Sequence, residues 1–315
     1  MKFNKILLLG YSKDNFSNDE WQRIDSLCNE KVFAASDDAN LNKHLANSDC
    51  LLVKLGVTVD QKMIDAAPNL KYVGMLGTGY GRIDTKYAAS KNICICNIVG
   101  YSTEGVAELA FGLLLEHIRD ISRAKIQAKE GNYSEADFQG YEISGKKFGV
   151  IGLGRIGKRI AEIAQGFGAE VSYWSHNRKE EAEKKGIQYQ EIEELLKTND
   201  FISLNLAFNS ETQNFLDSQK LQLIKPRAVI INLAPMELVD INALEEKLKQ
   251  KSITFILDHS DELSVDQAKQ LAQYENCIMY PPIGYITKEA TNAKTKMFVD
   301  NLTNFLNGKP TNKVN

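Results

Sequence analysis

The sequence lacks an excess of positive charge and any long apolar run. Its 38 basic and 41 acidic residues leave a net charge of −3, so no basic field exists to attract nucleic acid. No run approaches the ~18 apolar residues that a membrane helix requires. The apolar run near the N-terminus is too short for a signal peptide and reads as a first strand. We therefore expect a cytoplasmic globular protein with neither a nucleic acid nor a membrane as its partner.

Cysteine is sparse, and its pattern fits neither a disulfide framework nor a metal site. Cys94 and Cys96 lie in a strand-like run, where alternation places both side chains on one face. A metal pair there would need a second pair or a histidine cluster, and the sequence offers neither. Buried thiols in a reducing cytosol are predicted instead, with no metal. The cysteines are Cys28, Cys50, Cys94, Cys96 and Cys277.

The sequence does contain a regular alternation of short apolar runs and helical patterns over its 315 residues. Near-continuous apolar strands that alternate with helices are typical of parallel sheets covered on both faces. The runs form two series, and the second starts at Lys146. We predict an α/β fold with two doubly wound parallel-sheet domains, one of residues 1–101 plus 288–315 and one of residues 102–287. The last nine residues, NGKPTNKVN, are expected to be frayed.

A long helical segment follows Ser102, which is a good N-cap residue. Apolar residues surround it almost completely, and a helix of this kind is buried against another domain or another subunit. We expect one helix from about Thr103 to Lys125, with His117 as a packed histidine and not a catalytic one. The apolar positions are Val106, Leu109, Ala110, Phe111, Leu113, Leu114, Ile118 and Ile121.

The most specific motif is Gly152-Leu-Gly154-Arg-Ile-Gly157, which closes one predicted strand and opens a helix that leads to a second strand. In this context Gly152 permits a tight turn, Gly154 lets a pyrophosphate approach the backbone, and Gly157 lets helix and strand pack. The helix N-terminus then presents free N–H groups and the positive end of its dipole to the phosphates. Residues 102–287 are therefore predicted to form a Rossmann dinucleotide-binding domain.

The end of the second strand in this motif selects between the two nicotinamide dinucleotides. An acidic residue is usual there in NAD sites, where it binds the ribose hydroxyls. This chain has Ser175, His176, Asn177, Arg178 and Lys179 instead. These residues would bind a 2′-phosphate, and arginine offers a planar fork for it. We predict a preference for NADP(H), with NAD(H) as the alternative if Arg178 and Lys179 merely begin a solvated helix.

At this point the chain resembles the D-isomer-specific 2-hydroxyacid dehydrogenase family over nearly its whole length. The resemblance implies a flavodoxin-like substrate domain that is split in sequence, a Rossmann domain, an interdomain cleft and a homodimer built on the helix near 103–125. The family transfers hydride between nicotinamide and C2 of a hydroxy acid. The matching stretches are NLKYVGMLGTGYGRID, GYSTEGVAELAFGLLL, GKKFGVIGLGRIGKRIAEIAQGFGAEV, DFISLNL, INLA with ELVD, LD at 257–258, and PIG with TKEA.

The residues that carry the family's chemistry are changed in this chain. The family's arginine, which holds carboxylate and carbonyl, falls on Pro235, and its acid–base histidine falls on Pro282. The acidic residue that tunes this histidine falls on Leu263, although Asp261 and Glu262 are close to that position. Loss of one such group typically costs ~10²–10⁴ in rate. Little ordinary 2-oxoacid reductase activity is therefore expected.

The cofactor frame of the family is retained, by contrast. Asp258 resembles the acidic ligand of the nicotinamide carboxamide, and the loop Gly77-Thr78-Gly79 resembles the one that offers N–H groups to a substrate carboxylate. The residues expected around the cofactor are Val106, Gly152, Gly154, Arg155, Ile156, Gly157, Ser175, His176, Asn177, Arg178, Lys179, Leu206, Ala207, Asn232, Leu233, Ala234, Asp258, Pro282 and Gly284.

Two residues are candidates to replace the missing groups. Lys54, with Leu55 beside it, aligns with a substrate-facing loop and could hold a carboxylate or donate a proton; a solvated lysine at a strand end is the alternative. Tyr285 could donate a proton near Pro282, or simply pack under its turn. Alternation points His259 away from the nicotinamide, and Tyr80 and Tyr101 carry no specific signal.

The sequence therefore predicts an NADP(H)-dependent oxidoreductase that acts on a small carboxylate with a non-standard active site. A conjugated C=C bond or a C=N bond, already polarised or protonated, would need less from the missing residues than a C=O bond. A dinucleotide-binding regulator without catalysis is the alternative from another class. A 2-oxoacid reductase with displaced catalytic residues is the third possibility.

Overall fold

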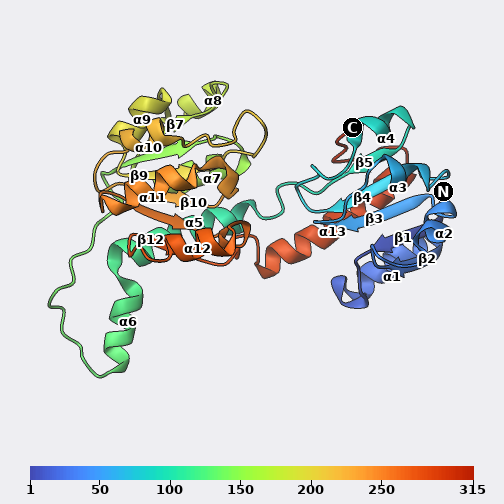
Figure 1. Cartoon of the computed structure of the whole chain (residues 1–315), viewed down its shortest axis with the longest axis horizontal. Coiled ribbons are helices and arrows are strands. Elements are labelled where there is room, and N and C mark those ends of the chain that lie inside the picture. Colours follow the sequence, from blue (N-terminus) through green and yellow to red (C-terminus); the bar gives the residue numbers. More distant parts are fainter. The chain divides into compact units, whose positions relative to one another are not determined.

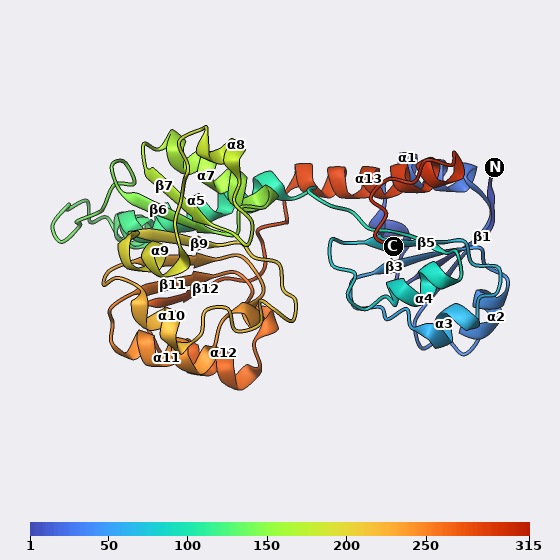
Figure 2. The ribbon, with the colours of Figure 1, turned by 90° about the horizontal axis from the view of Figure 1, so that it is seen from above.

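The computed structural model describes residues 1–315, and the chain divides into two compact units. Unit 1 contains Met1–Tyr101 and Lys288–Asn315, and unit 2 contains Ser102–Thr287. Each unit is a parallel sheet with helices on both faces (Figures 1 and 2), so the predicted α/β fold with two doubly wound sheets is confirmed.

Unit 1 is built on a five-stranded parallel sheet with the order β2-β1-β3-β4-β5. Apolar residues of α1 and α13 pack on one face, and those of α2, α3 and α4 pack on the other. The C-terminal helix thus returns to complete the core of the N-terminal segment. The strands are β1 (Phe3–Leu9), β2 (Cys28–Ala34), β3 (Cys50–Lys54), β4 (Tyr72–Leu76) and β5 (Cys94–Cys96), and the helices are α1 (Asn18–Ser26), α2 (Leu41–Ala46), α3 (Gln61–Asp65), α4 (Thr85–Ser90) and α13 (Lys288–Leu306).

Unit 2 is built on a seven-stranded parallel sheet with the order β12-β11-β10-β9-β6-β7-β8. One face is covered by α5, α7 and α8, and the other by α9 to α12. The strands are β6 (Lys147–Ile151), β7 (Glu170–Trp174), β8 (Gln188–Tyr189), β9 (Phe201–Leu204), β10 (Val229–Asn232), β11 (Thr254–Leu257) and β12 (Cys277–Met279). The helices are α5 (Thr103–Arg119), α6 (Ile121–Lys129), α7 (Arg155–Gly166), α8 (Glu180–Glu183), α9 (Ile192–Thr198), α10 (Ser218–Leu223), α11 (Ile241–Lys249) and α12 (Val265–Leu271).

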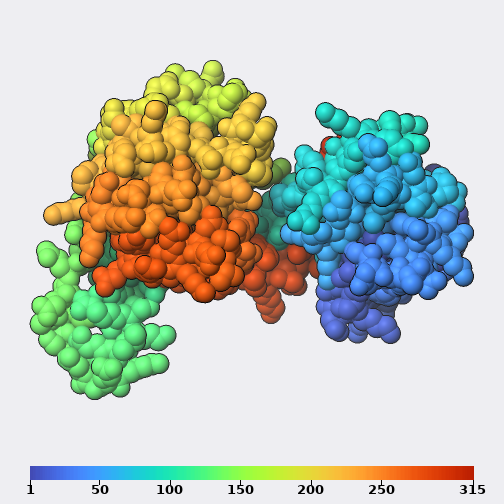
Figure 3. All heavy atoms as spheres, viewed as in Figure 1, coloured from blue at the N-terminus to red at the C-terminus, as the bar shows by residue number.

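The single helix expected from Thr103 to Lys125 is wrong, because the chain breaks at Asp120. Asp120 has a left-handed φ of 53°, which ends α5 and starts α6 in a new direction. The apolar residues of α5 are buried inside unit 2, against β6 and α7, whereas α6 buries none of its residues. Helix α6 and the loop after it stand out from the rest of unit 2 (Figures 1 and 3).

The expected fraying of the C-terminal tail is also wrong. The tail runs antiparallel to the free edge of β5, with a bridge between Cys96 and Lys313. The N–H of Val314 donates to the carbonyl oxygen of Ile95 at 3.0 Å, and the Asn315 side chain accepts from the N–H of Ile95 at 2.9 Å. The tail therefore satisfies backbone groups that an open sheet edge would leave exposed.

The cysteine side chains are buried, as predicted. All five cysteines are free and buried, and the sulfur atoms of Cys94 and Cys96 lie 3.7 Å apart on one face of β5. Burial raises the pKa of Cys277 to about 12, so this thiol stays protonated. None of the helices combines the length and the apolar character needed to cross a membrane.

Candidate functional site

The glycine-rich turn joins β6 to α7 at the centre of the unit 2 sheet. Gly152 has φ of 93°, and a Cβ on it would lie 2.8 Å from the carbonyl oxygen of Asn205. A Cβ on Gly157 would lie only 2.0 Å from the carbonyl oxygen of Gly152, so helix and turn pack in direct contact. Gly154 is the N-cap residue of α7, and a Cβ there would meet nothing within 4 Å. The open space is thus at the one glycine that a pyrophosphate must approach.

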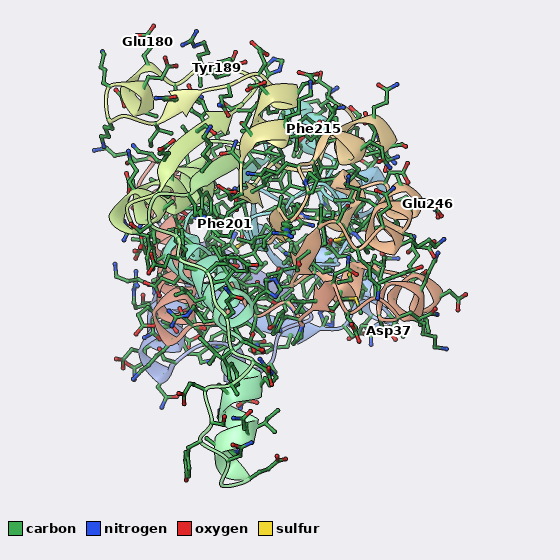
Figure 4. The ribbon with its side chains drawn as sticks, turned by 90° about the vertical axis from the view of Figure 1, so that its left-hand side faces the viewer. Asp37, Glu180, Tyr189, Phe201, Phe215 and Glu246 are labelled. Carbon is green, nitrogen blue, oxygen red and sulfur yellow. The ribbon has the colours of Figure 1, made fainter.

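Arg178, at the end of β7, is held by two neighbours. Its guanidinium donates to both carboxylate oxygens of Glu183, at 3.1 and 2.6 Å, and lies over the ring of Tyr189 at 4.9 Å. Figure 4 labels Tyr189 and Glu180, the first residue of α8, at the same edge of unit 2. Arg178 stays 62% exposed, and Lys179 is the N-cap residue of α8. The cation predicted to bind a 2′-phosphate thus faces solvent, with an acidic partner that competes for it.

Ser175 is arranged differently from Arg178. It is buried, and its hydroxyl donates to the carbonyl oxygen of Asn177 at 2.6 Å, so it stabilises the turn that presents the exposed side chains. His176 and Asn177 are exposed. At the next strand, Leu206 follows β9 and its side chain lies over Gly152.

The loop after β10 contains the first proline of interest. Asn232 is fully buried, and its side-chain oxygen accepts from the N–H of Ala234 at 3.1 Å, which fixes the start of the loop. Pro235 is half-buried, with φ of −52° and ψ of 138°. It precedes a short 3-10 helix, Met236–Leu238. Proline therefore occupies an extended position here without strain.

Asp258 follows β11 and has one satisfied and one unsatisfied oxygen. Its Oδ2 accepts from the N–H of Gly284 at 3.1 Å, whereas its Oδ1 is buried and has no hydrogen-bond partner. Burial raises the pKa of this carboxyl group. A Cβ on Gly284 would meet Asp258, Leu109 and Val106, so the start of α5 closes around the same point. A buried acceptor without a donor indicates a position for a ligand N–H.

His259 faces two carboxylates of this loop, and the expectation that it points away from the nicotinamide stays a prediction. Strand β11 ends at Leu257, and a 3-10 helix at Ser260–Glu262 turns the chain back. His259 Nε2 lies 3.7 Å from Asp258 Oδ1, and Nδ1 lies 3.2 Å from Glu262 Oε1. The structure thus places His259 beside Glu262, two residues to which the sequence pattern assigned no catalytic role.

Tyr285 is 40% exposed, and its two alternative roles, proton donor near Pro282 or packing under that turn, stay predictions. Pro282 itself is half-buried and Pro281 is exposed. The N–H of Gly284 ties this loop to Asp258.

In unit 1, the predicted carboxylate site lies at the adjoining carboxyl ends of β3 and β4, where Lys54 pairs in register with Leu76. The N–H groups of Thr78 and Gly79 donate no backbone hydrogen bond. Lys54 has a neighbour that sequence reasoning missed: burial and the charge of Lys54 lower the pKa of Lys294 on α13. The ion pairs of unit 1 involve neither lysine. Leu55 lies over Gly77 and is 61% exposed.

Comparison with known proteins identifies the family. Residues 111–284 match the model described as D-isomer specific 2-hydroxyacid dehydrogenase, NAD binding domain. A glyoxylate reductase of Thermococcus litoralis is 35% identical over 277 residues, which cover 85% of this chain and 83% of that protein. The chain belongs to the D-isomer-specific 2-hydroxyacid dehydrogenase family. Membership places it among the NAD(P)-dependent oxidoreductases.

Two solved structures of similar proteins bear on the comparison. A 2-hydroxyacid dehydrogenase of Ketogulonicigenium vulgare superposes with a TM-score of 0.87 over 100% of this chain and 99% of that one, at 23% identity, which shows the shared fold. An acyclic imino acid reductase in complex with NADPH and D-Arg has a TM-score of 0.84 at 28% identity, over 99% of this chain and 100% of that one.

The residues of unit 2 fit the nicotinamide dinucleotide that the family uses. Gly154 leaves open space before the N-terminus of α7, and Asp258 Oδ1 lacks the donor that a carboxamide would supply. When bound, the cofactor would supply a hydride. The chain's own groups would orient it: the α7 amides would face the phosphates, and Asp258 would face the carboxamide. Glu183 and Tyr189 were missed by sequence reasoning because their roles depend on contacts with Arg178.

Proposed function

We propose that this protein is an NADP(H)-dependent oxidoreductase that reduces a C=N bond in a small carboxylate substrate, with a conjugated C=C bond as the alternative. The observation that carries the proposal is the set of charges around Pro235 and Pro282. Carboxylates of Asp258 and Glu262 lie next to these loops, and their ion-pair partner is His259, with no lysine or arginine. This environment suits a substrate that becomes cationic.

The physical argument compares two substrates. Reduction of a 2-oxo acid builds negative charge on oxygen, which needs a cation and a proton donor. Reduction of a protonated imine starts from a positive charge and removes it as hydride arrives, so no cation is needed. Neighbouring carboxylates favour the protonated imine over the neutral one, because opposite charges attract more strongly in a partly buried site. The same carboxylates would oppose a developing alkoxide.

Similarity supports both the bond and the cofactor. The structure that is 28% identical over 99% of this chain is named as an acyclic imino acid reductase and contains NADPH. Relatives named glyoxylate reductase would instead favour a C=O substrate. The changed residues at Pro235, Leu263 and Pro282 are the reason to prefer the imine.

Single-turnover oxidation of bound NADPH tests the proposal directly. The protein is mixed with a panel of 2-oxo acids, the same acids preincubated with an amine, and unsaturated acids. We expect oxidation with the imines and almost none with the oxo acids alone. Oxidation by the unsaturated acids only would reassign the bond to C=C. Tight NADPH binding without any oxidation would make the protein a dinucleotide-binding regulator.

We expect NADPH to bind more tightly than NADH, through Arg178. The change Arg178→Ala should weaken NADPH binding by roughly tenfold to a hundredfold, because a charge-assisted hydrogen bond to phosphate is lost. NADH binding should hardly change. Titration of cofactor fluorescence measures both constants.

The matched control for this prediction is Glu183→Gln, which removes the carboxylate that competes for Arg178. This variant should bind NADPH at least as tightly as the natural protein. Equal affinities of the natural protein for NADPH and NADH would contradict the assignment.

We also propose that unit 1 holds the substrate carboxylate, through the N–H groups of Thr78 and Gly79 and the ammonium groups of Lys54 and Lys294. Two lysines without an ion-pair partner, of which the charge of Lys54 lowers the pKa of Lys294, would be stabilised by an anion between them. The support is the lowered pKa of Lys294 together with the free N–H groups of the loop.

The proposed homodimer needs an apolar surface, and exposed apolar side chains on α6 and the loop after it support an interface there. Ile121, Ile126, Tyr133 and Tyr141 are 48%, 59%, 81% and 58% exposed. Such a surface is costly to leave in water. Light scattering at micromolar concentration should give the mass of two chains, and Ile121→Ser with Ile126→Ser should give one. The change Ile286→Ser, at a residue that is 58% exposed elsewhere in unit 2, should leave the dimer intact; a monomeric natural protein would end the proposal.

A further inference from the structure

Three titratable side chains lie together after β11 and form what we call the His259 cluster: Asp258, His259 and Glu262. The imidazole lies between the two carboxylates, with Nδ1 3.2 Å from Glu262 Oε1 and Nε2 3.7 Å from Asp258 Oδ1. The side chains of Asp258, His259 and Glu262 are 4%, 24% and 29% exposed. Nδ1 is thus within close ion-pair distance of Glu262, and Nε2 is farther from its neighbour Asp258.

The cluster is tied to both loops in which the family's charged catalytic residues are replaced. Glu262 Oε2 accepts from the N–H of Met236 at 2.9 Å, and Met236 directly follows Pro235. Asp258 Oδ2 accepts from the N–H of Gly284 at 3.1 Å, two residues after Pro282. The imidazole is therefore held between the two loops that lost an arginine and a histidine.

We propose that His259, oriented by Glu262, is the catalytic acid that protonates the imine nitrogen of the substrate. This inference rests on the proposed function. The Nε2–H of the imidazolium gives its proton to the neutral imine, and a cationic iminium and a neutral imidazole result. The iminium carbon then accepts a hydride, which bound NADPH supplies, so that the C=N bond becomes C–N and NADP⁺ remains. Solvent returns a proton to His259.

The charges around the imidazole favour this role. Burial lowers the pKa of His259, but the hydrogen bond to Glu262 and the charges of Asp258, Glu262 and Asp261 outweigh it and raise the pKa above its ordinary value. Glu237 also contacts Glu262, so a further carboxylate faces the cluster. The charged imidazolium form is therefore favoured more than in a free histidine. After it has given its proton away, the same carboxylates stabilise the cationic substrate.

A cavity lies beside the cluster. Glu262 and Met236 border a cavity of about 440 Å³ that Glu237, Leu263 and Gln267 also line. The proton that leaves belongs to Nε2, so solvent returns it to Nε2, while Nδ1 keeps its proton toward Glu262.

The experiment compares an imine that needs a proton with one that does not. The first substrate is the open-chain imine of a 2-oxo acid and a primary amine, and the second is an N-methylated cyclic iminium carboxylate, which is permanently cationic. Single-turnover NADPH oxidation is measured with the natural protein and with His259→Asn. We expect a loss of ~10²–10⁴-fold with the ionisable imine, the usual contribution of a general acid. The permanently cationic substrate should lose less than about threefold.

The pH profile gives a second, independent prediction. With the ionisable imine, the rate of the natural protein should fall as pH rises through the raised pKa of His259, because the acid form is lost. Glu262→Gln removes the interaction that raises this pKa, so the fall should move to lower pH. Asp261→Asn, which removes an exposed carboxylate of the same short helix, is the control and should shift the fall far less.

A measurement without turnover tests the cluster itself. NMR titration of the cofactor-free protein should give an imidazole midpoint for His259 above the ordinary ~6.5, and a lower midpoint in Glu262→Gln. The His259→Asn spectrum assigns the signal among the four histidines. Thermal unfolding and NADPH titration check that each variant is folded, and His259→Gln is the second variant if His259→Asn is not.

The outcomes separate this inference from the proposed function. If the natural protein reduces both substrates and His259→Asn reduces both equally fast, His259 is not the acid but the proposed function stands. An equal loss on both substrates would show that His259 shapes the site and donates no proton, which also overturns the inference. If the natural protein reduces neither substrate, the proposed function fails and the role of His259 fails with it.

Discussion

Glyoxylate, pyruvate and hydroxypyruvate are expected to be reduced at least ~10²–10⁴-fold more slowly than ordinary enzyme turnover of ~1–10³ s⁻¹. Pro235 and Pro282 provide neither a cation nor a proton at the positions where the family places them. The nearby charges of Asp258 and Glu262 are negative, which opposes a developing alkoxide. Steady-state NADPH oxidation with the three acids makes the measurement. The expectation holds although a relative 35% identical to this chain is named glyoxylate reductase.

Restoring both residues should recover much of this activity, and restoring one should recover little. Pro235→Arg alone leaves the proton without a source, and Pro282→His alone leaves the alkoxide without a cation. The two changes together should therefore act more than additively, because the residues of one catalytic unit are coupled. Pro235 has an extended conformation that arginine also adopts, so the substitution itself introduces no backbone strain.

The neighbouring proline offers a control for the restored histidine. Pro281→His places the same side chain one residue away, and combined with Pro235→Arg it should give no recovery. Adding Leu263→Glu to the restored pair supplies the third family residue. If the natural protein already reduces these acids at ordinary rates, Pro235 and Pro282 do not limit its 2-oxoacid reductase activity. The proton donor would then be sought at His259, Lys54 and Tyr285.

The second large effect is expected at Gly157 and Gly154, near the junction of β6 and α7. Alanine at Gly157 should lower the stability of the protein, and alanine at Gly154 should weaken cofactor binding. Gly157→Ala places a Cβ 2.0 Å from the carbonyl oxygen of Gly152, so helix and turn must separate. Overpacking of this kind costs about 1–3 kcal/mol or more, and the cofactor-free protein should lose that much stability in urea unfolding. Backbone atoms form the clash, so no side-chain rotation relieves it.

Gly154→Ala is the matched change, three residues earlier, at the N-cap of α7. Its φ of −79° suits alanine, and the Cβ would meet nothing within 4 Å, so stability without cofactor should be unchanged. The Cβ would project into the space that the pyrophosphate needs, and NADPH binding should weaken by roughly tenfold to a hundredfold. Unchanged NADPH affinity in Gly154→Ala would show that the phosphates do not approach this turn.

The sequence by itself determined the class of fold and the family. Strands such as β3 and β10 are buried on both faces, so they appear as continuous apolar runs that are visible without any tertiary information. The glycine motif could be recognised for a similar reason. Its spacing and the strand and helix around it all lie within one short stretch of the sequence. Short strand β8, with two residues and one of them exposed, gave no such pattern.

The tertiary structure alone decided features that depend on partners far away in sequence. The apolar pattern continues from α5 across Asp120 to Ile121, but only the packing of α5 on β6 and α7 shows where burial ends. The C-terminal tail is ordered because β5, about 200 residues earlier, offers it a free edge. Lys294 is a candidate site residue only because α13 returns to Lys54.

His259 shows the physical reason most clearly. Strand alternation assigns side-chain directions only while the strand lasts, and β11 ends one residue before Asp258. Beyond that point the direction is decided by the hydrogen bonds of Glu262 to Met236 and of Asp258 to Gly284, which lie 26 residues apart in each case. A periodic pattern cannot encode contacts between separate loops, so the cluster between the two prolines could be found only in the folded chain.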